Sequence, residues 1–156
     1  MVKSYILHTT YYILLLGYAG YISFQLLVNP LNAPIPKADR LQFMDDWPSG
    51  YGIPEVIEFI KAESQKEPIF LATEGTFGLT PYALMIYLQG TPGLQIEGYW
   101  PLAQNMNTII ATGKTITTYV LFKDTQEPQP EWPLTPVLKY RKGRGEVFTT
   151  LYKVNQ

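Results

Sequence analysis

The sequence has no cysteine and a single histidine, His8, among its 156 residues. The absence of cysteine excludes disulfide scaffolds, thiol catalysis, and zinc or iron–sulfur centres held by cysteine. One histidine argues against a multi-histidine metal site and against a Ser-His-Asp triad within the chain. We therefore predict no metal site and no cofactor, and we assign no catalytic residue.

Charged residues are also scarce. They make up 16% of the chain, compared with roughly a quarter in an average soluble protein. The formal net charge is -1. This near-neutral balance argues against a nucleic-acid partner, which would require many phosphate contacts. A hydrophobic content of 46% excludes a disordered chain, and the length fits about one domain.

A long uncharged segment occupies residues 5–28. A helix of this length spans roughly 36 Å, enough for a ~30 Å hydrocarbon core, and Pro30 disfavours helix at Asn29. We predict a transmembrane helix within residues 1–29. A cleaved signal peptide and a buried soluble helix are the alternatives. The apolar stretch is longer than most signal-peptide cores, and the rest of the chain is too short to bury it.

This helix points to the lipid bilayer as one partner, and to other transmembrane helices as further ones. Small residues along it suit close packing between helices: Gly17, Ala19, Gly20 and Ser23. Its orientation does not follow from charge, because Lys3 precedes it while Lys37 and Arg40 follow it.

Residues 30–52 are predicted to form a linker and entry loop, kept extended by prolines. Beyond them, helical and strand patterns alternate. Apolar spacing predicts helices, β-branched and apolar runs predict strands, and the last two strands are expected to pair as a hairpin. The helices are expected at 53–66, 80–88 and 101–111, and the strands at 68–73, 94–99, 115–122, 134–140 and 147–154.

Strands separated by helices imply right-handed crossovers and a mainly parallel sheet. We therefore predict an α/β fold in which the transmembrane helix is followed by a small three-layer domain at 53–156, with a C-terminal hairpin. The helix at 80–88 is apolar on nearly every face, so we expect it to be deeply packed.

Glu74, Gly75 and Thr76 follow the first strand of this domain and precede a helix. Open parallel sheets commonly bind ligands at the carboxyl ends of their strands. Glycine would let a sugar or phosphate approach the backbone, and helix amide groups would face it. We take these three residues as candidate ligand-binding residues, and a plain strand-to-helix turn as the alternative.

Three aromatic residues complete the candidate ligand-binding set: Trp47, Tyr51 and Trp100. Each lies beside proline or glycine in a predicted loop. Exposed rings in loops stack on sugar rings or lie at a membrane interface. The alternative is that such rings anchor their loops in the core.

Two clusters of charged residues, one acidic and one basic, each allow a structural and a functional interpretation. Asp45 and Asp46 could ligate a hard cation, but such pairs more often cap a helix or stay solvated. The basic cluster formed by Lys139, Arg141, Lys142 and Arg144 could meet anionic lipid headgroups or a lipid-linked phosphate. We expect instead that it is a solvated hairpin turn.

Several stretches of the sequence resemble those of a known family. They are residues 46–52 with the predicted helix that follows, residues 72–84, and residues 131–134, 140–143 and 151–154. Together they resemble the carboxyl-terminal end of bacterial membrane glycosyltransferases of the dolichyl-phosphate-mannose–protein mannosyltransferase-like family. The resemblance covers nearly the whole chain. It implies a last transmembrane helix followed by an extracytoplasmic α/β domain, with the N-terminus in the cytoplasm.

Members of that family transfer a sugar from a polyprenyl-phosphate donor outside the cytoplasm. Their essential acidic residue lies in the first extracytoplasmic loop, which this sequence does not contain, so no catalytic residue is carried over. The resemblance implies an accessory or acceptor-positioning role. The implied partners are a catalytic glycosyltransferase chain and a lipid-linked sugar or glycan acceptor. The alternative is a single-pass anchored protein-interaction module with no carbohydrate role.

Overall fold

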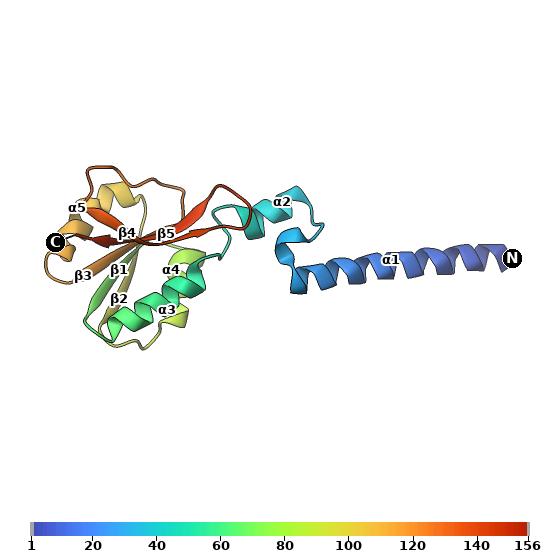
Figure 1. Ribbon diagram of the computed structural model, residues 1–156, viewed down its shortest axis with the longest axis horizontal. Helices are drawn as coiled ribbons and strands as arrows, with labels where there is room; N and C mark the ends of the chain where they lie inside the picture. Colours follow the sequence, from blue (N-terminus) through green and yellow to red (C-terminus); the bar gives the residue numbers. More distant parts are fainter. Residues whose placement is uncertain (1, 156) are drawn as a thin grey trace. The chain divides into compact units, whose positions relative to one another are not determined.

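The computed structural model describes residues 2–155, with side chains described from Ile6 onward. The chain divides into two compact units, residues 1–40 and 41–156. The first unit contains the long helix α1 (Val2–Val28), a short 3-10 turn η1 (Pro30–Asn32) and a single helical turn α2 (Lys37–Arg40) (Figure 1).

Helix α1 contains one segment, Ile6–Val28, that is long and apolar enough to cross a membrane. The most apolar part of this segment is 0% buried within the structure. The described residues therefore give no support to a helix buried in the core of this chain. A signal sequence near the N-terminus would meet the same criteria of length and composition.

The segment after α1 is not the extended linker that its prolines predict. It contains η1 and α2, and the second unit then opens with a π-helical turn, η2 (Leu41–Asp45). The Arg40 guanidinium donates hydrogen bonds to the backbone carbonyls of Leu31, at 2.8 Å, and Ala33, at 2.7 Å. This side chain folds the segment back on itself, an effect that proline spacing alone does not reveal.

The second unit is built on a five-stranded sheet with the strand order β2-β1-β3-β5-β4. Strand β1 (Ile69–Glu74) pairs in parallel with both β2 (Leu94–Tyr99) and β3 (Thr117–Phe122). Strand β5 (Phe148–Val154) runs antiparallel to β3 and to β4 (Leu134–Arg141). The expected α/β fold with a C-terminal hairpin is confirmed, and most elements lie within two residues of their predicted bounds.

Helices cover both faces of this sheet (Figure 1). Helices α3 (Ile53–Ser64) and α4 (Leu79–Tyr87) pack on one face, where Ile60, Leu84 and Leu121 share one hydrophobic core. Helix α5 (Leu102–Gly113) packs on the other face, where Met106, Ile109 and Val120 share a second core. The domain therefore has the three layers that the sequence predicts.

Helix α4 is less buried than its composition predicts. Ala83, Leu84 and Leu88 contact the core, but Met85 and Ile86 are exposed, Ile86 to 67%. The expectation of deep packing is wrong for this outer face. A short helix lying on one face of a sheet buries a single stripe, and no described element covers the other side of α4.

Candidate functional site

A pocket of about 300 Å³ lies at the carboxyl edge of the three parallel strands. From β1 the chain crosses one face of the sheet through α4 to reach β2. From β2 it crosses the opposite face through α5 to reach β3, on the other side of β1. The loops after β1 and β2, two neighbouring strands, thus leave toward opposite faces of the sheet, as at the ligand crevices of open α/β sheets. The pocket is lined by Trp47, Gly75, Thr76, Phe77, Trp100, Lys123 and Thr125.

Aromatic rings and one cation form the walls of this pocket. Trp47, Phe77 and Trp100 are 46%, 75% and 54% exposed, so their rings are open to a ligand. The Lys123 ammonium lies 4.6 Å from the centre of the Trp47 ring, a cation–π contact. Gly75 has a φ of +101°, and a Cβ there would lie 3.2 Å from Lys123 Nζ. Glycine at this position leaves room for the lysine head group.

Glu74 lies fully buried beneath the pocket, at the end of β1. Its carboxylate accepts hydrogen bonds from the backbone N–H of Lys123, at 2.8 Å, and from the hydroxyl of Thr125. Burial raises the pKa of Glu74, and the hydrogen bond from Lys123 N–H and the charge of Lys123 oppose that rise. The carboxylate therefore ties the end of β1 to the segment that leaves β3. It shapes the pocket without lining it.

Lys142 is also fully buried, although the sequence places it in a solvated basic turn. Its ammonium donates hydrogen bonds to the carbonyl oxygens of Trp47, at 2.8 Å, and of Lys123, at 3.2 Å. Burial lowers the pKa of Lys142 to about 8, while the negative charges of Glu74 and Asp124 act in the opposite direction. Lys142 thus joins the two chain segments that carry Trp47 and Lys123.

The two adjacent aspartates have structural roles. Asp45 is 8% exposed and accepts a hydrogen bond from the backbone N–H of Arg144 at 2.9 Å. Asp46 accepts one from the backbone N–H of Trp47 at 2.7 Å. A Cβ at Gly143 would overlap the Asp45 side chain, so the hairpin turn packs closely on this segment. Among the described residues, no three potential metal-ligating side chains form a cluster.

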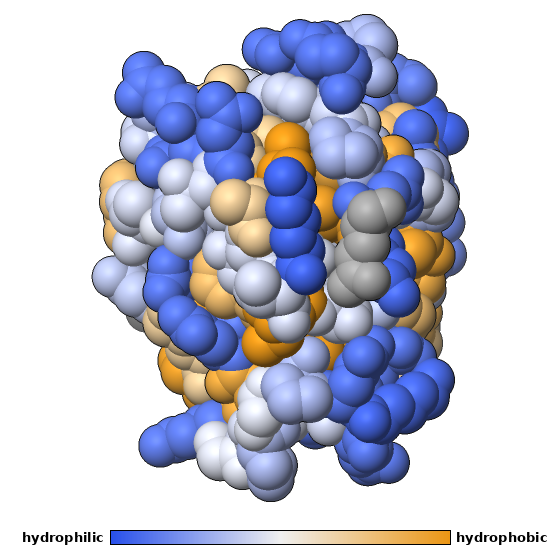
Figure 2. All heavy atoms as spheres, turned by 90° about the vertical axis from the view of Figure 1, so that its left-hand side faces the viewer, coloured by the Kyte–Doolittle hydropathy of each residue, from blue (hydrophilic) through white to orange (hydrophobic). Residues whose placement is uncertain are grey.

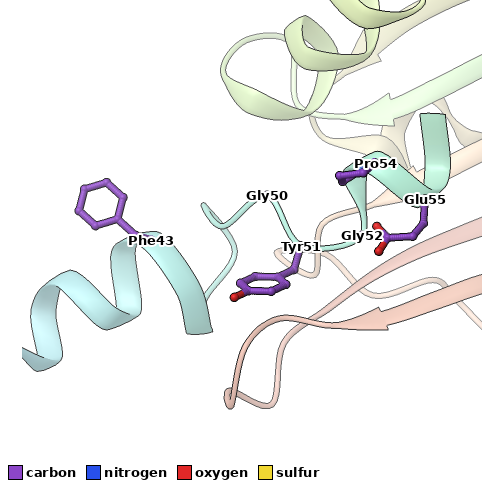
Figure 3. Close-up of a pocket in the computed structure, with 6 residues that line it drawn as sticks. All are labelled: Phe43, Gly50, Tyr51, Gly52, Pro54 and Glu55. Atoms are coloured by element: carbon purple, nitrogen blue, oxygen red, sulfur yellow. The ribbon is translucent and has the colours of Figure 1, made fainter. Parts of the chain in front are cut away.

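Tyr51 lies apart from the other candidate residues, in a second pocket of about 450 Å³ (Figure 3). It projects from the loop before α3, and the Phe43 ring points away from it (Figure 3). Its backbone carbonyl accepts a hydrogen bond from the Thr149 hydroxyl at 2.6 Å. The remaining residues that line this pocket are Gly50, Gly52, Pro54 and Glu55.

The structure thus brings together Trp47, Gly75, Thr76 and Trp100, with Glu74 beneath them, and it separates Tyr51. Sequence reasoning missed four contributors: Phe77, Lys123, Thr125 and Lys142. The rule that selected the residues after β1 would also have selected Lys123 and Thr125, which follow β3. No sequence signal marks Lys142, because its neighbours in the turn are charged and polar.

This arrangement is suited to holding a ligand. Flat rings, one ammonium group and the hydroxyls of Thr76 and Thr125 can contact a polar molecule with an apolar face. Glu74 is fully buried and hydrogen-bonded, so it is not placed to exchange a proton with a ligand. Comparison of the chain with protein-family models, with curated proteins and with solved structures finds no match.

Proposed function

We propose that residues 41–156 form a membrane-tethered binding domain whose carboxyl-edge pocket holds the sugar-phosphate part of a lipid-linked sugar. In this proposal the domain lies outside the cytoplasm and serves a polyprenyl-phosphate-sugar-dependent glycosyltransferase. Its role is accessory, either covering the active site or positioning the acceptor, and the chemical step belongs to a partner chain.

The single observation that carries this proposal is the pocket's combination of open indole rings with one ammonium group. Trp47 and Trp100 offer apolar faces on which a sugar ring stacks, because the axial C–H groups of sugars are apolar. The Lys123 ammonium, held over the Trp47 ring, offers a charge for one phosphate. The resemblance to membrane glycosyltransferases supplies the class of ligand.

The polar groups that the pocket offers support an accessory role in this proposal. A glycosyl transfer needs an ionised carboxylate or another base close to the acceptor hydroxyl. Among the described pocket-lining residues, the ionisable side chain is Lys123. The nearest buried carboxylate, Glu74, already accepts two hydrogen bonds from the protein. These features support binding and give no support to catalysis by this chain.

The test is a fluorescence titration of the full chain in detergent micelles. The chain has three tryptophans, and Trp132 packs against the second core and does not line the pocket. A Trp132→Phe background therefore leaves the two pocket indoles as reporters. We expect a saturable change in emission with a short-chain polyprenyl-phosphate mannose, and a weaker one with mannose 1-phosphate or polyprenyl phosphate alone.

Two variants decide whether the signal arises in the pocket. Lys123→Met should weaken binding about tenfold or more, because a charge-assisted contact contributes roughly 1.5–3 kcal/mol. Tyr51→Phe, in the separate pocket, should leave binding unchanged. No saturable change with any of the three probes, or equal weakening by both variants, would overturn the proposal.

A further inference from the structure

Helix α4 lies in a stretch of chain without charge. Residues 75–96 contain no aspartate, glutamate, lysine or arginine. Despite this, much of the stretch is on the surface: Phe77 is 75% exposed, Ile86 67% and Tyr87 66%. An exposed apolar surface of this extent marks a site of contact with another apolar surface.

The exposed apolar side chains of the second unit are concentrated in three places. Among the described residues, the large apolar side chains that are exposed lie in η2 and the loop after it, in α4 with the loop before it, and at Trp100. They are Leu41, Phe43, Trp47, Phe77, Leu79, Tyr82, Met85, Ile86, Tyr87 and Trp100.

These places are neighbours in space. Trp47, Phe77 and Trp100 share the carboxyl-edge pocket. Gly50 lines a second pocket with Phe43 and a third, between α3 and α4, with Leu79 and Tyr87. A Cβ at Gly50 would lie 3.7 Å from the Leu79 side chain. Residues 41–50 therefore adjoin α4, and we call the exposed apolar side chains of these two segments, together with Phe77 and Trp100, the α4 face. Glu58 and Lys61 of α3 lie at its border, in the pocket between α3 and α4.

Other parts of the same unit are polar. Helix α5 is the other crossover helix, and its outward residues include Gln104, Asn107 and Thr108. Figure 2 looks onto the face where β5 ends, and hydrophilic side chains gather there around smaller apolar areas. Glu67 and Lys153 line a shallow pocket beside the end of β5. The α4 face is thus a local feature of the unit.

The tether, residues 29–40, holds the α4 face close to whatever surrounds α1. Twelve residues, 29–40, join α1 to the second unit. Fully extended they would span roughly 40 Å, and the turns η1 and α2 shorten that reach. A unit of this size has a radius of gyration of about 13 Å, so its whole surface stays within reach of the bilayer that holds α1. A tether of this length keeps the local concentration of lipid surface high.

We propose that the α4 face rests on the lipid bilayer in which α1 is anchored, with Phe77, Tyr82 and Ile86 at the level of the headgroups and upper acyl chains. Aromatic and aliphatic side chains without charge are the residues that favour this interfacial layer. The inference rests on α1 lying in a bilayer. It does not depend on any ligand in the carboxyl-edge pocket.

The test uses the absence of cysteine from the chain. Single-cysteine variants of the full chain, each carrying a nitroxide spin label, are reconstituted in vesicles of phosphatidylcholine, with or without phosphatidylglycerol. Ile86→Cys reports on the α4 face, and Gln104→Cys on α5 is the matched control. Both sites are exposed, so neither label disturbs the core. For each spin label, the collision rate with oxygen, which partitions into lipid, is compared with the collision rate with a nickel chelate, which stays in water.

We expect the ratio of oxygen to nickel collisions to be several-fold higher at position 86 than at position 104. Because α4 carries no charge and Lys123 is the one ionisable side chain among the described residues of the adjoining pocket, the ratio should depend only weakly on phosphatidylglycerol. Equal ratios at the two positions would overturn the proposal. A label at 86 shielded from both reagents would also overturn it, because a protein would then cover the face. Loss of that shielding on dilution in lipid would identify a second copy of this chain.

Discussion

Two neighbouring regions of the second unit reverse the usual distribution of polarity. Beneath the carboxyl-edge pocket, the charged side chains of Glu74 and Lys142 are fully buried. On the α4 face, the apolar side chains of Phe77 and Ile86 are exposed. Buried charge and exposed apolar surface both cost stability or solubility. Their occurrence side by side distinguishes this edge of the sheet from the rest of the unit.

The buried charged side chains have partners within the chain, whereas the exposed apolar side chains do not. The buried charges are satisfied within the chain, because Glu74 accepts two hydrogen bonds and Lys142 donates two. The exposed apolar side chains contact nothing among the described residues that would cover them. The first region should therefore respond to mutation through the free energy of unfolding, and the second through association with a surface.

The largest effect is expected from Glu74→Leu. The substitution leaves the buried N–H of Lys123 without an acceptor and removes a negative charge near Lys142, so unfolding should become easier by about 3 kcal/mol or more. Glu74→Gln is the control, because its amide oxygen still accepts a hydrogen bond, and it should cost far less. Chemical denaturation of the full chain in micelles, followed by tryptophan emission, measures both. Equal losses would mean that the negative charge near Lys142, which both variants lack, matters and that the hydrogen-bond acceptor for Lys123 N–H does not.

The next effect is a pH dependence from Lys142. Its pKa in the folded protein is about 8, below the ordinary value of 10.5, so between these values the unfolded chain binds more protons. The free energy of unfolding should therefore rise as the pH increases from about 8 toward 10, by at most on the order of 3 kcal/mol.

Lys142→Met tests this assignment, since the variant has no ammonium group to release a proton. Its stability should change less with pH than that of the natural chain over the same interval. Measurements should stay below pH 10, because burial raises the pKa of Tyr99 and Tyr119 to about 12 and their titration lowers stability at higher pH. Parallel curves for the two proteins would contradict the assignment.

A smaller effect is expected from Gly75→Ala at the pocket wall. The φ of +101° disfavours alanine, and its Cβ would crowd the Lys123 ammonium. A loss of about 1–2 kcal/mol is expected. Gly90→Ala is the control, because Gly90 also has a positive φ, +76°, but open space around its Cβ position. The difference between the two variants isolates the crowding at Lys123.

The smallest effect on folding is expected on the α4 face. Ile86→Ser removes a side chain that is 67% exposed, so the free energy of unfolding in micelles should change by no more than about 0.5 kcal/mol. Leu84→Ala, two residues earlier and fully buried, should cost about 2–5 kcal/mol. A large loss from Ile86→Ser would mean that this side chain belongs to the core.

The sequence predicts the elements of this fold well because their signals are local. The apolar spacing of Ile53, Val56 and Ile60 is a property of one helix, and the apolar run of β1 is a property of one strand. Burial of Lys142 depends instead on two carbonyl oxygens that are far away in the chain. Partial exposure of α4 depends on how many faces of the helix other elements cover. Neither property is carried by a short stretch of residues.

The candidate site also contains residues that local sequence predicts and residues that only tertiary contacts place. Gly75, Thr76 and Trp100 are predictable because each follows a parallel strand, and such strand ends meet at one edge. Trp47 reaches that edge through a tertiary contact, the hydrogen bond from Lys142 to its carbonyl. Tyr51, only four residues later, lies in a separate pocket because the chain turns between them, where the N–H of Ser49 donates a hydrogen bond to the carbonyl of Asp46 at 3.0 Å.

The contacts of residues 45–47 with the β4–β5 hairpin also have a mechanical consequence. Any force transmitted along the tether enters the folded unit at residue 41 and soon reaches Asp45 and Trp47. Both are bonded to the hairpin turn, through the N–H of Arg144 and the ammonium of Lys142. Tension would thus load these two bonds before it reaches α3. The contacts with the hairpin thus lie between α1 and the core of the second unit along the path that such a force would take through the chain.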